Sequence, residues 1–192
     1  MTARPLKMLL ALTVLGLLTQ GCATPVGVLY REAFDKRSLE QKDIDSEETY
    51  ILEVPQVKQA ADNCCGLAAL AMVVHYWREK PESIEFVKEH QCPPEGFTGQ
   101  ELVRIAVSQG FKALVYKGSL PDLFKHLSAT RPVIVILQRY GGLHYVVVVG
   151  HSQEGGLIVN DPAKGQIIYE IGYFMESWKK AKYFSMMVVP RS

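Results

Sequence analysis

The 192-residue sequence has little net charge and lacks the motifs of several large classes of proteins. Its formal net charge is +1 at pH 7, so no basic field indicates a nucleic-acid partner. It contains no Cys-x-x-Cys or His-Glu-x-x-His motif, and the histidines other than His144 are scattered, which argues against a metal site. It also contains no Gly-x-x-x-x-Gly-Lys-Ser/Thr loop for ATP. We therefore expect no nucleic acid, metal, ATP or other cofactor.

Long apolar runs are scarce as well. Beyond the N-terminus, the run from Val146 to Val149 has the length of a strand and is far too short to span a membrane. At the N-terminus, Arg4 and Lys7 precede an apolar stretch from Met8 to Leu18, which is too short for a mature spanning helix. Residues 1–21 are therefore predicted to be a signal peptide.

The end of this segment resembles a bacterial lipobox. The sequence Leu18-Thr19-Gln20-Gly21-Cys22 fits, although Thr19 stands where leucine is usual. Lipidation of Cys22 with palmitate-like acyl chains would give stable membrane attachment. The alternative is an ordinary cleaved signal with a chance cysteine. Because Ala23 rather than aspartate follows, the pattern resembles an outer-membrane sorting signal. We expect a lipoprotein of the bacterial envelope, facing the periplasm.

The remaining chain divides into a tether and one domain. Residues 22–53 are predicted to be a lipidated N-terminus and tether, because Arg31 to Thr49 is rich in charge and poor in periodic apolar residues. The globular part begins near Tyr50. Residues 54–192 are long enough for a single domain with one core.

The four cysteines are few enough to sort by context. If Cys22 carries lipid, Cys64, Cys65 and Cys92 remain in an oxidising compartment. Three is an odd number, so the simplest arrangement is one disulfide and one free thiol. Adjacent cysteines rarely form a disulfide with each other. The favoured disulfide is therefore Cys64–Cys92, with Cys65 as the free thiol.

Helix signals dominate the first half of the domain. The stretch from Leu67 to Trp77 is apolar almost all round, which predicts a central buried helix, with Asp62 or Asn63 as its cap. Thr98-Gly99-Gln100-Glu101 and Ser119-Leu120-Pro121-Asp122 are capping-box patterns that introduce further helices. Helices are predicted at 67–77, 81–90, 98–109, 119–127 and 172–180.

Strand signals dominate the second half. The segments are short and rich in β-branched or aromatic residues, and Gly141-Gly142 and Gly155-Gly156 lie where hairpin turns are needed. Strands are predicted at 113–117, 133–138, 144–150, 157–160, 166–171 and 183–189, with an edge strand or extended lead-in over 51–57. The order of elements predicts an α+β domain in which the Cys65 helix packs against a largely antiparallel sheet.

Four residues have the chemistry of a thiol hydrolase. Cys65 would lie at the N-terminus of the buried helix, where unpaired N–H groups and the helix dipole favour a thiolate. His144 would pair with that thiolate and later protonate the leaving amine. Asp161 would orient the imidazole if a hairpin makes their strands neighbours. Gln59, six residues before Cys65, would offer its amide N–H₂ to the oxyanion, together with the Cys65 backbone N–H.

Each of these residues also has a purely structural explanation. Cys65 is of a type often buried in cores, and His144 is compatible with a core histidine. Asp161-Pro162 is a common turn dipeptide, and Gln59 is compatible with a surface position. All four nevertheless fit one mechanism in a workable order, which favours an enzyme that cuts an acyl bond.

From about Val54 to Val189 the chain resembles the papain-like peptidase family that removes double-glycine leaders from bacteriocins and related secreted peptides. The motifs that carry the resemblance are Gln59…Cys65-Gly66 with Ala68-Ala69-Leu70-Ala71-Met72, His144 through Gly150, Asp161-Pro162 with Gly165, and Phe174…Trp178. The resemblance implies a papain-like fold. It also implies that Cys65 is the nucleophile, His144 the base, Asp161 the orienting residue and Gln59 the oxyanion donor.

Two features depart from the family's pattern. Cys64 stands where members commonly have aspartate or a small polar residue, and the ATP-driven exporter domains of many members are missing. We therefore expect a stand-alone thiol peptidase of the cell envelope that acts on an exported protein or peptide. Two alternatives stay open: a non-catalytic peptide-binding or leader-binding module on the same fold, and an amidase or transpeptidase with the same machinery.

Overall fold

The computed structural model describes residues 49–78 and 86–191. The predicted signal peptide, Cys22, nearly all of the predicted tether and most of the helix predicted at 81–90 therefore lie outside the described residues. Among the helices of the described residues, none is long and apolar enough to cross a membrane.

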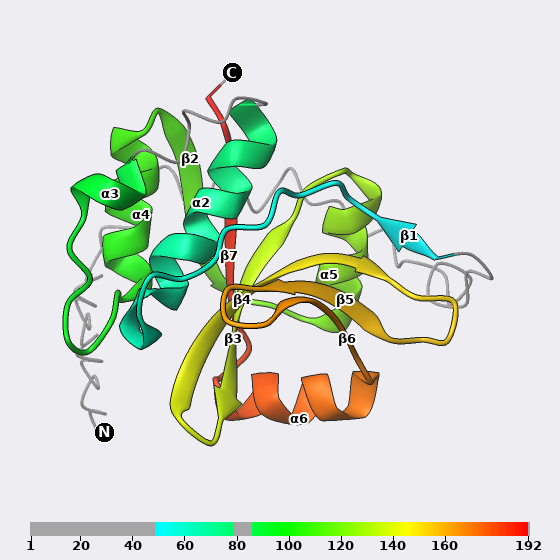
Figure 1. Ribbon diagram of the computed structural model, residues 1–192. Coiled ribbons are helices and arrows are strands. Elements are labelled where there is room, and N and C mark those ends of the chain that lie inside the picture. The colour runs from blue at the N-terminus through cyan, green and yellow to red at the C-terminus, as the bar shows by residue number, and fades with distance from the viewer. Residues whose placement is uncertain (1–48, 79–85, 192) are drawn as a thin grey trace, which may run out of the picture. The chain divides into compact units, whose positions relative to one another are not determined.

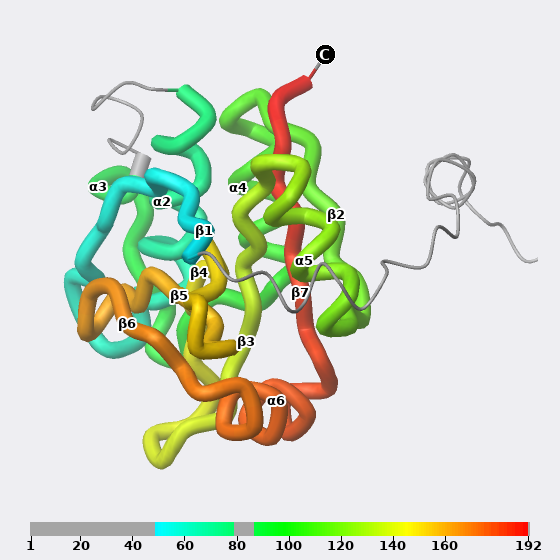
Figure 2. Tube along the Cα trace, turned by 90° about the vertical axis from the view of Figure 1, so that its right-hand side faces the viewer, coloured from blue at the N-terminus to red at the C-terminus, as the bar shows by residue number. Residues whose placement is uncertain are grey.

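Within the described residues, seven strands form one sheet, and each described pair is antiparallel. The strands are β1 (Tyr50–Ile51), β2 (Phe111–Lys117), β3 (Val133–Arg139), β4 (Gly142–His151), β5 (Leu157–Asp161), β6 (Gly165–Tyr169) and β7 (Phe184–Pro190). Their order is β2-β7-β3-β4-β5-β6, and β1 pairs with the end of β4. The C-terminal strand β7 therefore lies inside the sheet, between the edge strand β2 and β3 (Figure 2).

Helices cover this sheet. They are a 3-10 turn, η2 (Asp62–Cys64), followed by α2 (Cys65–Arg78), α3 (Phe86–Glu89), α4 (Gly99–Ser108), α5 (Leu120–Ser128) and α6 (Ile171–Lys180). Helix α2 packs against β4, α4 against β2 and α6 against β3. In Figure 1, α2, α3 and α4 lie together at the upper left, and α6 lies apart from them at the bottom. Strands β3, β4 and β5 are buried along consecutive residues, as expected for strands that are covered on both faces. The predicted α+β class is confirmed.

Helix α2 is the centre of the core. Its first ten residues are buried, and Leu67, Leu70 and Val73 are fully so. A helix without a polar face has no stable place on a surface, so its composition forces it into the interior. Gly66 also favours close approach to the sheet, because a Cβ there would lie 3.1 Å from the ring of Tyr145, a tight contact. The start of α2 is thereby held at a fixed depth against β4.

Two helix starts follow the predicted capping boxes. The Thr98 hydroxyl accepts a hydrogen bond from the backbone N–H of Glu101, whose carboxylate accepts one from the Thr98 N–H at 2.7 Å. Ser119 and Asp122 make the same reciprocal pair at the start of α5. Both predictions are confirmed. They could be made from the sequence because the four residues that make each box are adjacent in the chain.

The predicted cap of the Cys65 helix is wrong. The chain enters α2 through the 3-10 turn η2, which begins after Ala61 and has no side-chain cap. The Asn63 amide is used elsewhere, on backbone oxygens of a loop about 30 residues further along the chain. The predicted strand 166–171 also ends early. Glu170 leaves the strand and accepts hydrogen bonds from the N–H groups of Gly172 and Tyr173, so it caps α6.

The central role of α2 gives a stability prediction. We expect Leu70→Ala to lower the free energy of unfolding by about 2–5 kcal/mol, because it leaves a cavity in a fully buried helix. Denaturant unfolding followed by circular dichroism measures this difference. Val107→Ala on α4 is the control, since Val107 is 41% exposed, and its effect should stay within about 0.5 kcal/mol. Equal effects of the two changes would contradict the central position of α2.

Candidate active site

Cys65 is the first residue of α2 and is buried at the junction with the 3-10 turn. The first turn of a helix leaves backbone N–H groups without partners inside the helix, and these point toward the cysteine end. The His144 side chain and the backbone N–H groups of Tyr145 and Gly66 act on the Cys65 sulfur as donors that lower the pKa of its thiol. The thiol therefore lies where donors converge on it from both α2 and β4.

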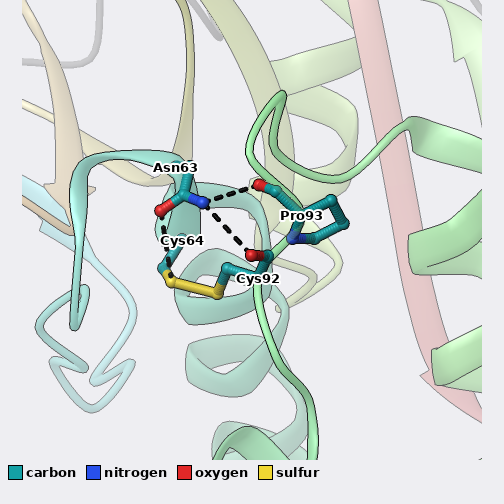
Figure 3. Close-up of a disulfide and its surroundings, with 4 residues drawn as sticks. All are labelled: Asn63, Cys64, Cys92 and Pro93. Carbon is teal, nitrogen blue, oxygen red and sulfur yellow. Dashed lines mark hydrogen bonds between the residues drawn. A yellow bond between two sulfur atoms is a disulfide. The ribbon is translucent and has the colours of Figure 1, made fainter.

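A disulfide holds the residue before it. Cys64 is joined to Cys92, with their Cα atoms 5.5 Å apart, and Cys65 is a free cysteine. This is the pairing that the cysteine count favoured. The Asn63 amide donates to the carbonyl oxygens of Cys92 at 3.2 Å and Pro93 at 2.6 Å (Figure 3). The segment after Cys92 is thus clamped to the start of α2 by one covalent bond and two hydrogen bonds.

His144 and Asp161 meet across neighbouring strands. Asn160 pairs with Val147 between β5 and β4. Because side chains alternate between faces along a strand, Asp161 lies on the same face of the sheet as His144. His144 Nε2 is 2.9 Å from Asp161 Oδ1, and the Asp161 side chain is fully buried. The hairpin between β4 and β5 that the sequence predicted thus brings the two residues together.

Asp161 is ionised in this environment. Burial acts to raise its pKa, but hydrogen bonds from His144 and from the Ala163 N–H, with the charges of His144 and Arg139, lower the pKa to about 2. A carboxylate only accepts hydrogen bonds, so His144 Nε2 carries the proton that lies between them. The Nδ1 atom is then the ring nitrogen that remains for Cys65.

The same contacts favour an ion pair between Cys65 and His144. Burial raises the pKa of the Cys65 thiol, but the hydrogen bond from His144, the N–H groups of Tyr145 and Gly66 and the charge of His144 lower it below its usual range. Burial lowers the pKa of His144, but its hydrogen bonds to Asp161 and Cys65 raise it above its usual range. Thiolate and imidazolium stabilise each other, as in an activated cysteine nucleophile.

Gln59 lies in the extended segment that follows β1. Its backbone N–H donates to the carbonyl oxygen of Pro162 at 3.0 Å, which ties this segment to the turn after Asp161. The Oε1 atom of Gln59 is buried and has no hydrogen-bond partner among the described residues. No described contact joins the Gln59 side chain to Cys65, so its assignment as oxyanion donor stays a prediction.

One polar residue of the site was missed by the sequence analysis. Arg139 Nη2 lies 2.6 Å from Asp161 Oδ2, so the carboxylate has a second charged partner. Leu137 pairs with His144, and Arg139 lies two residues further along β3 on the same face. The sequence did contain a signal for the position of Arg139. A two-residue turn before the His144 strand fixes which residues of β3 pair with which residues of β4.

A cleft of about 780 Å³ opens at Cys65. It is lined by Asp62 and Asn63 of the 3-10 turn, by the loop 94–99, and by Ile136, Gly141, Leu143, Tyr145 and Phe184. The Cys64–Cys92 disulfide stands at the base of the loop that forms one wall. The volume of the cleft is large enough for several residues of a peptide. Its lining is mostly apolar, which is typical of a ligand site.

Comparison with known proteins identifies the family. The model of the Peptidase C39 family matches residues 53–187. The chain belongs to this family. It is a cysteine peptidase of the bacteriocin-processing type, and its fold is the papain-like one that the sequence predicted. A search of curated proteins finds no significant match.

Solved structures of C39 peptidases share the fold. The peptidase domain of Streptococcus ComA, a bi-functional ABC transporter involved in quorum sensing, has a TM-score of 0.59 and 25% identity, covering 74% of this chain and 99% of that one. A putative C39-like peptidase from Bacillus anthracis has a TM-score of 0.58 and 22% identity, covering 76% and 99%. A double-glycine-motif protease from an AMS/PCAT transporter, solved with its leader peptide, has a TM-score of 0.57 and 23% identity, covering 74% and 95%.

The contacts of the free thiol lead to a reactivity prediction. At about pH 6 an ordinary thiol is almost entirely protonated, so we expect iodoacetamide to modify Cys65 on the order of tenfold faster than a free thiol in solution. His144→Ala should abolish this advantage, because the imidazolium stabilises the thiolate. Peptide mapping by mass spectrometry locates the modified cysteine.

His151→Ala is the matched control for this experiment. His151 lies at the other end of β4, where its ring contacts those of Tyr50 and Phe124. We expect Cys65 in this variant to react with iodoacetamide as fast as Cys65 in the protein without substitutions. Equally slow reaction of Cys65 with and without His144 would contradict the ion pair.

Proposed function

We propose that this C39 peptidase is a lipid-anchored enzyme of the cell envelope, and that it cleaves an exported protein or peptide with Cys65 as nucleophile. The observation that carries the proposal is the chain of contacts from the free thiol of Cys65 through His144 to the buried carboxylate of Asp161, at the edge of a peptide-sized cleft. The leader-peptide complex of the AMS/PCAT protease supports a peptide as the ligand of such a cleft.

The proposed reaction has two steps. The Cys65 thiolate attacks the carbonyl carbon of the scissile bond, and the oxyanion meets the amide N–H₂ of Gln59 and the backbone N–H of Cys65. His144 gives its proton to the leaving amine. The amine departs, and the acyl group remains on Cys65 as a thioester. Water then attacks the thioester while His144 takes up its proton, and the acid product leaves. Asp161 holds the imidazole in one tautomer throughout.

The substrate is best sought in cells. We expect cells with Cys65→Ala to accumulate one or more envelope or secreted proteins that the unmodified cells cleave. Comparative proteomics of protein N-termini in the two strains identifies the cut. His144→Ala should give the same set of uncut proteins, and His151→Ala should not. Identical N-termini in all strains would contradict the peptidase assignment of this site.

The two alternatives give different outcomes in the same system. A transpeptidase would join the acyl group to an amine and would incorporate no oxygen from labelled water. An amidase and a peptidase would both incorporate one oxygen atom from labelled water into the carboxyl product, but an amidase would release ammonia, whereas a peptidase releases a peptide with a new N-terminus. A peptide-binding module would retain its ligand equally well with Cys65→Ala and would leave no cut at all. The complete set of Cys65, His144 and Asp161 favours the enzyme.

The lipid anchor rests on the sequence Gly21-Cys22 after the apolar stretch, which lies outside the described residues. We expect the full chain to fractionate with membranes and to incorporate labelled palmitate. Cys22→Ala should lose both properties while Cys65 keeps its reactivity toward iodoacetamide. Membrane attachment that survives Cys22→Ala would contradict the anchor but not the catalytic assignment.

A further inference from the structure

Arg139 contacts the carboxylate that also holds His144. Its Nη2 atom is 2.6 Å from Asp161 Oδ2, while His144 Nε2 is 2.9 Å from Oδ1, so the two partners occupy different oxygens. The Arg139 side chain is 16% exposed and that of Asp161 is fully buried. An ion pair shielded in this way is stronger than one on the surface, where water and salt screen it.

Arg139 is itself held from the other side. Its guanidinium carbon lies 5.5 Å from the ring centroid of Tyr169 on β6. Tyr169 in turn stacks on Tyr173 of α6, with ring centroids 5.6 Å apart and an angle of 15° between the planes. A planar guanidinium both stacks on an aromatic face and donates from its edge, which an ammonium group does not do. The guanidinium therefore approaches Asp161 in a fixed orientation.

The hydrogen bonds to its two oxygens together define the plane of the Asp161 carboxylate. Oδ1 accepts from His144 and from the Ala163 N–H at 2.8 Å, and Oδ2 accepts from Arg139. We infer that Arg139 is a positioning residue: it holds the Asp161 carboxylate so that Oδ1 faces His144, and its charge sets the upper pH limit of the active ion pair. This inference rests on the proposed roles of Cys65, His144 and Asp161.

The charged groups that act on His144 come from three elements. Cys65 on α2 and Asp161 on β5 form hydrogen bonds with its ring, and Arg139 on β3 acts through its charge. Strand β1 and helix α5 also contact β4, and they meet it near His151 at the opposite end. The protonation of His144 is therefore governed by burial and by these three side chains.

The sign of the effect follows from these contacts. The positive charge of Arg139 lowers the pKa of His144, against the hydrogen bonds to Asp161 and Cys65 that raise it. Removal of Arg139 takes away a cation that opposes the protonation of His144, and it leaves His144 as the charged partner of Asp161 among the described residues. Both changes raise the pKa of His144. The imidazolium then persists to higher pH. At the same time the carboxylate loses its fixed plane, so the ring is less well oriented for proton transfer.

The test uses the full chain and iodoacetamide, so it needs no knowledge of the substrate. The alkylation rate of Cys65 should rise with pH in two steps, first as the thiolate–imidazolium pair forms and again as His144 loses its proton. We expect Arg139→Met to move the second step upward by on the order of half a pH unit. Arg139→Lys should keep that step near its original position, because the charge is retained. A second step that does not move in Arg139→Met would overturn the inference.

Lys180→Met is the matched control. Lys180 and Arg139 both line a cavity of about 360 Å³, but the Lys180 ammonium pairs with Glu176 on α6. Loss of this cation should leave both steps in place. A shift as large as that of Arg139→Met would show a general effect of charge and would overturn the specific role of Arg139.

Chemical rescue keeps the test decisive if Arg139→Met folds poorly. Arg139 lines this cavity and contacts Asp161, so Arg139→Ala should open the cavity toward Asp161. Guanidinium at millimolar concentration should then enter it and return the second step toward its original pH. Sodium chloride at the same concentration should not. Failure of guanidinium to restore the step, in a variant whose circular dichroism is unchanged, would overturn the inference. Slow alkylation of the unmodified protein would instead contradict the proposed function, so the two failures are distinguishable.

Discussion

The register of three antiparallel strands is the constraint on which the site depends. Strands β3, β4 and β5 pair so that Arg139, His144 and Asp161 fall on one face of the sheet, although they come from three different strands. A shift of one residue in either pairing would turn one of these side chains to the other face. The tight turn between β3 and β4 fixes the first pairing. Asn160 of β5 is fully buried and its amide donates to the carbonyl oxygen of Val54, a contact that favours one register of the second pairing. The geometry of the proposed catalytic site thus follows from ordinary strand pairing.

Helix α2 supplies the other half of the site by a different route. It is placed by burial, since none of its faces is polar enough for the surface, and Gly66 sets how closely its start approaches Tyr145. Cys65, the proposed nucleophile, therefore lies where the deeply buried start of α2 meets β4. Buried elements on both sides would keep sulfur and imidazole within reach of each other without a bound substrate, which is the condition for a preformed ion pair.

Features that depend on adjacent residues were largely predictable from the sequence. Contacts between distant residues were predictable only where a counting rule or a hairpin signal linked them, as for Cys64–Cys92 and His144–Asp161. The capping boxes at Thr98 and Ser119 involve four consecutive residues each, and the burial of α2 follows from its composition. The role of Asn63 was missed because its partners at Cys92 and Pro93 belong to a loop 29 and 30 residues away. Arg139 was missed for a related reason. Its partner became visible only once the strand register and the direction of its side chain were known.

The clamp formed by Cys64, Cys92 and Asn63 affects the stage of maturation at which the cleft of the enzyme is completed. It joins the start of the nucleophile's helix to the loop that walls the cleft, and a covalent part of it requires an oxidising compartment. In a reducing cytoplasm the chain would carry an additional thiol beside Cys65 and a cleft wall held by hydrogen bonds alone. Completion of the cleft would then coincide with export. In an exported enzyme, such an arrangement would confine proteolysis to the oxidising compartment and would spare the proteins of the cytoplasm.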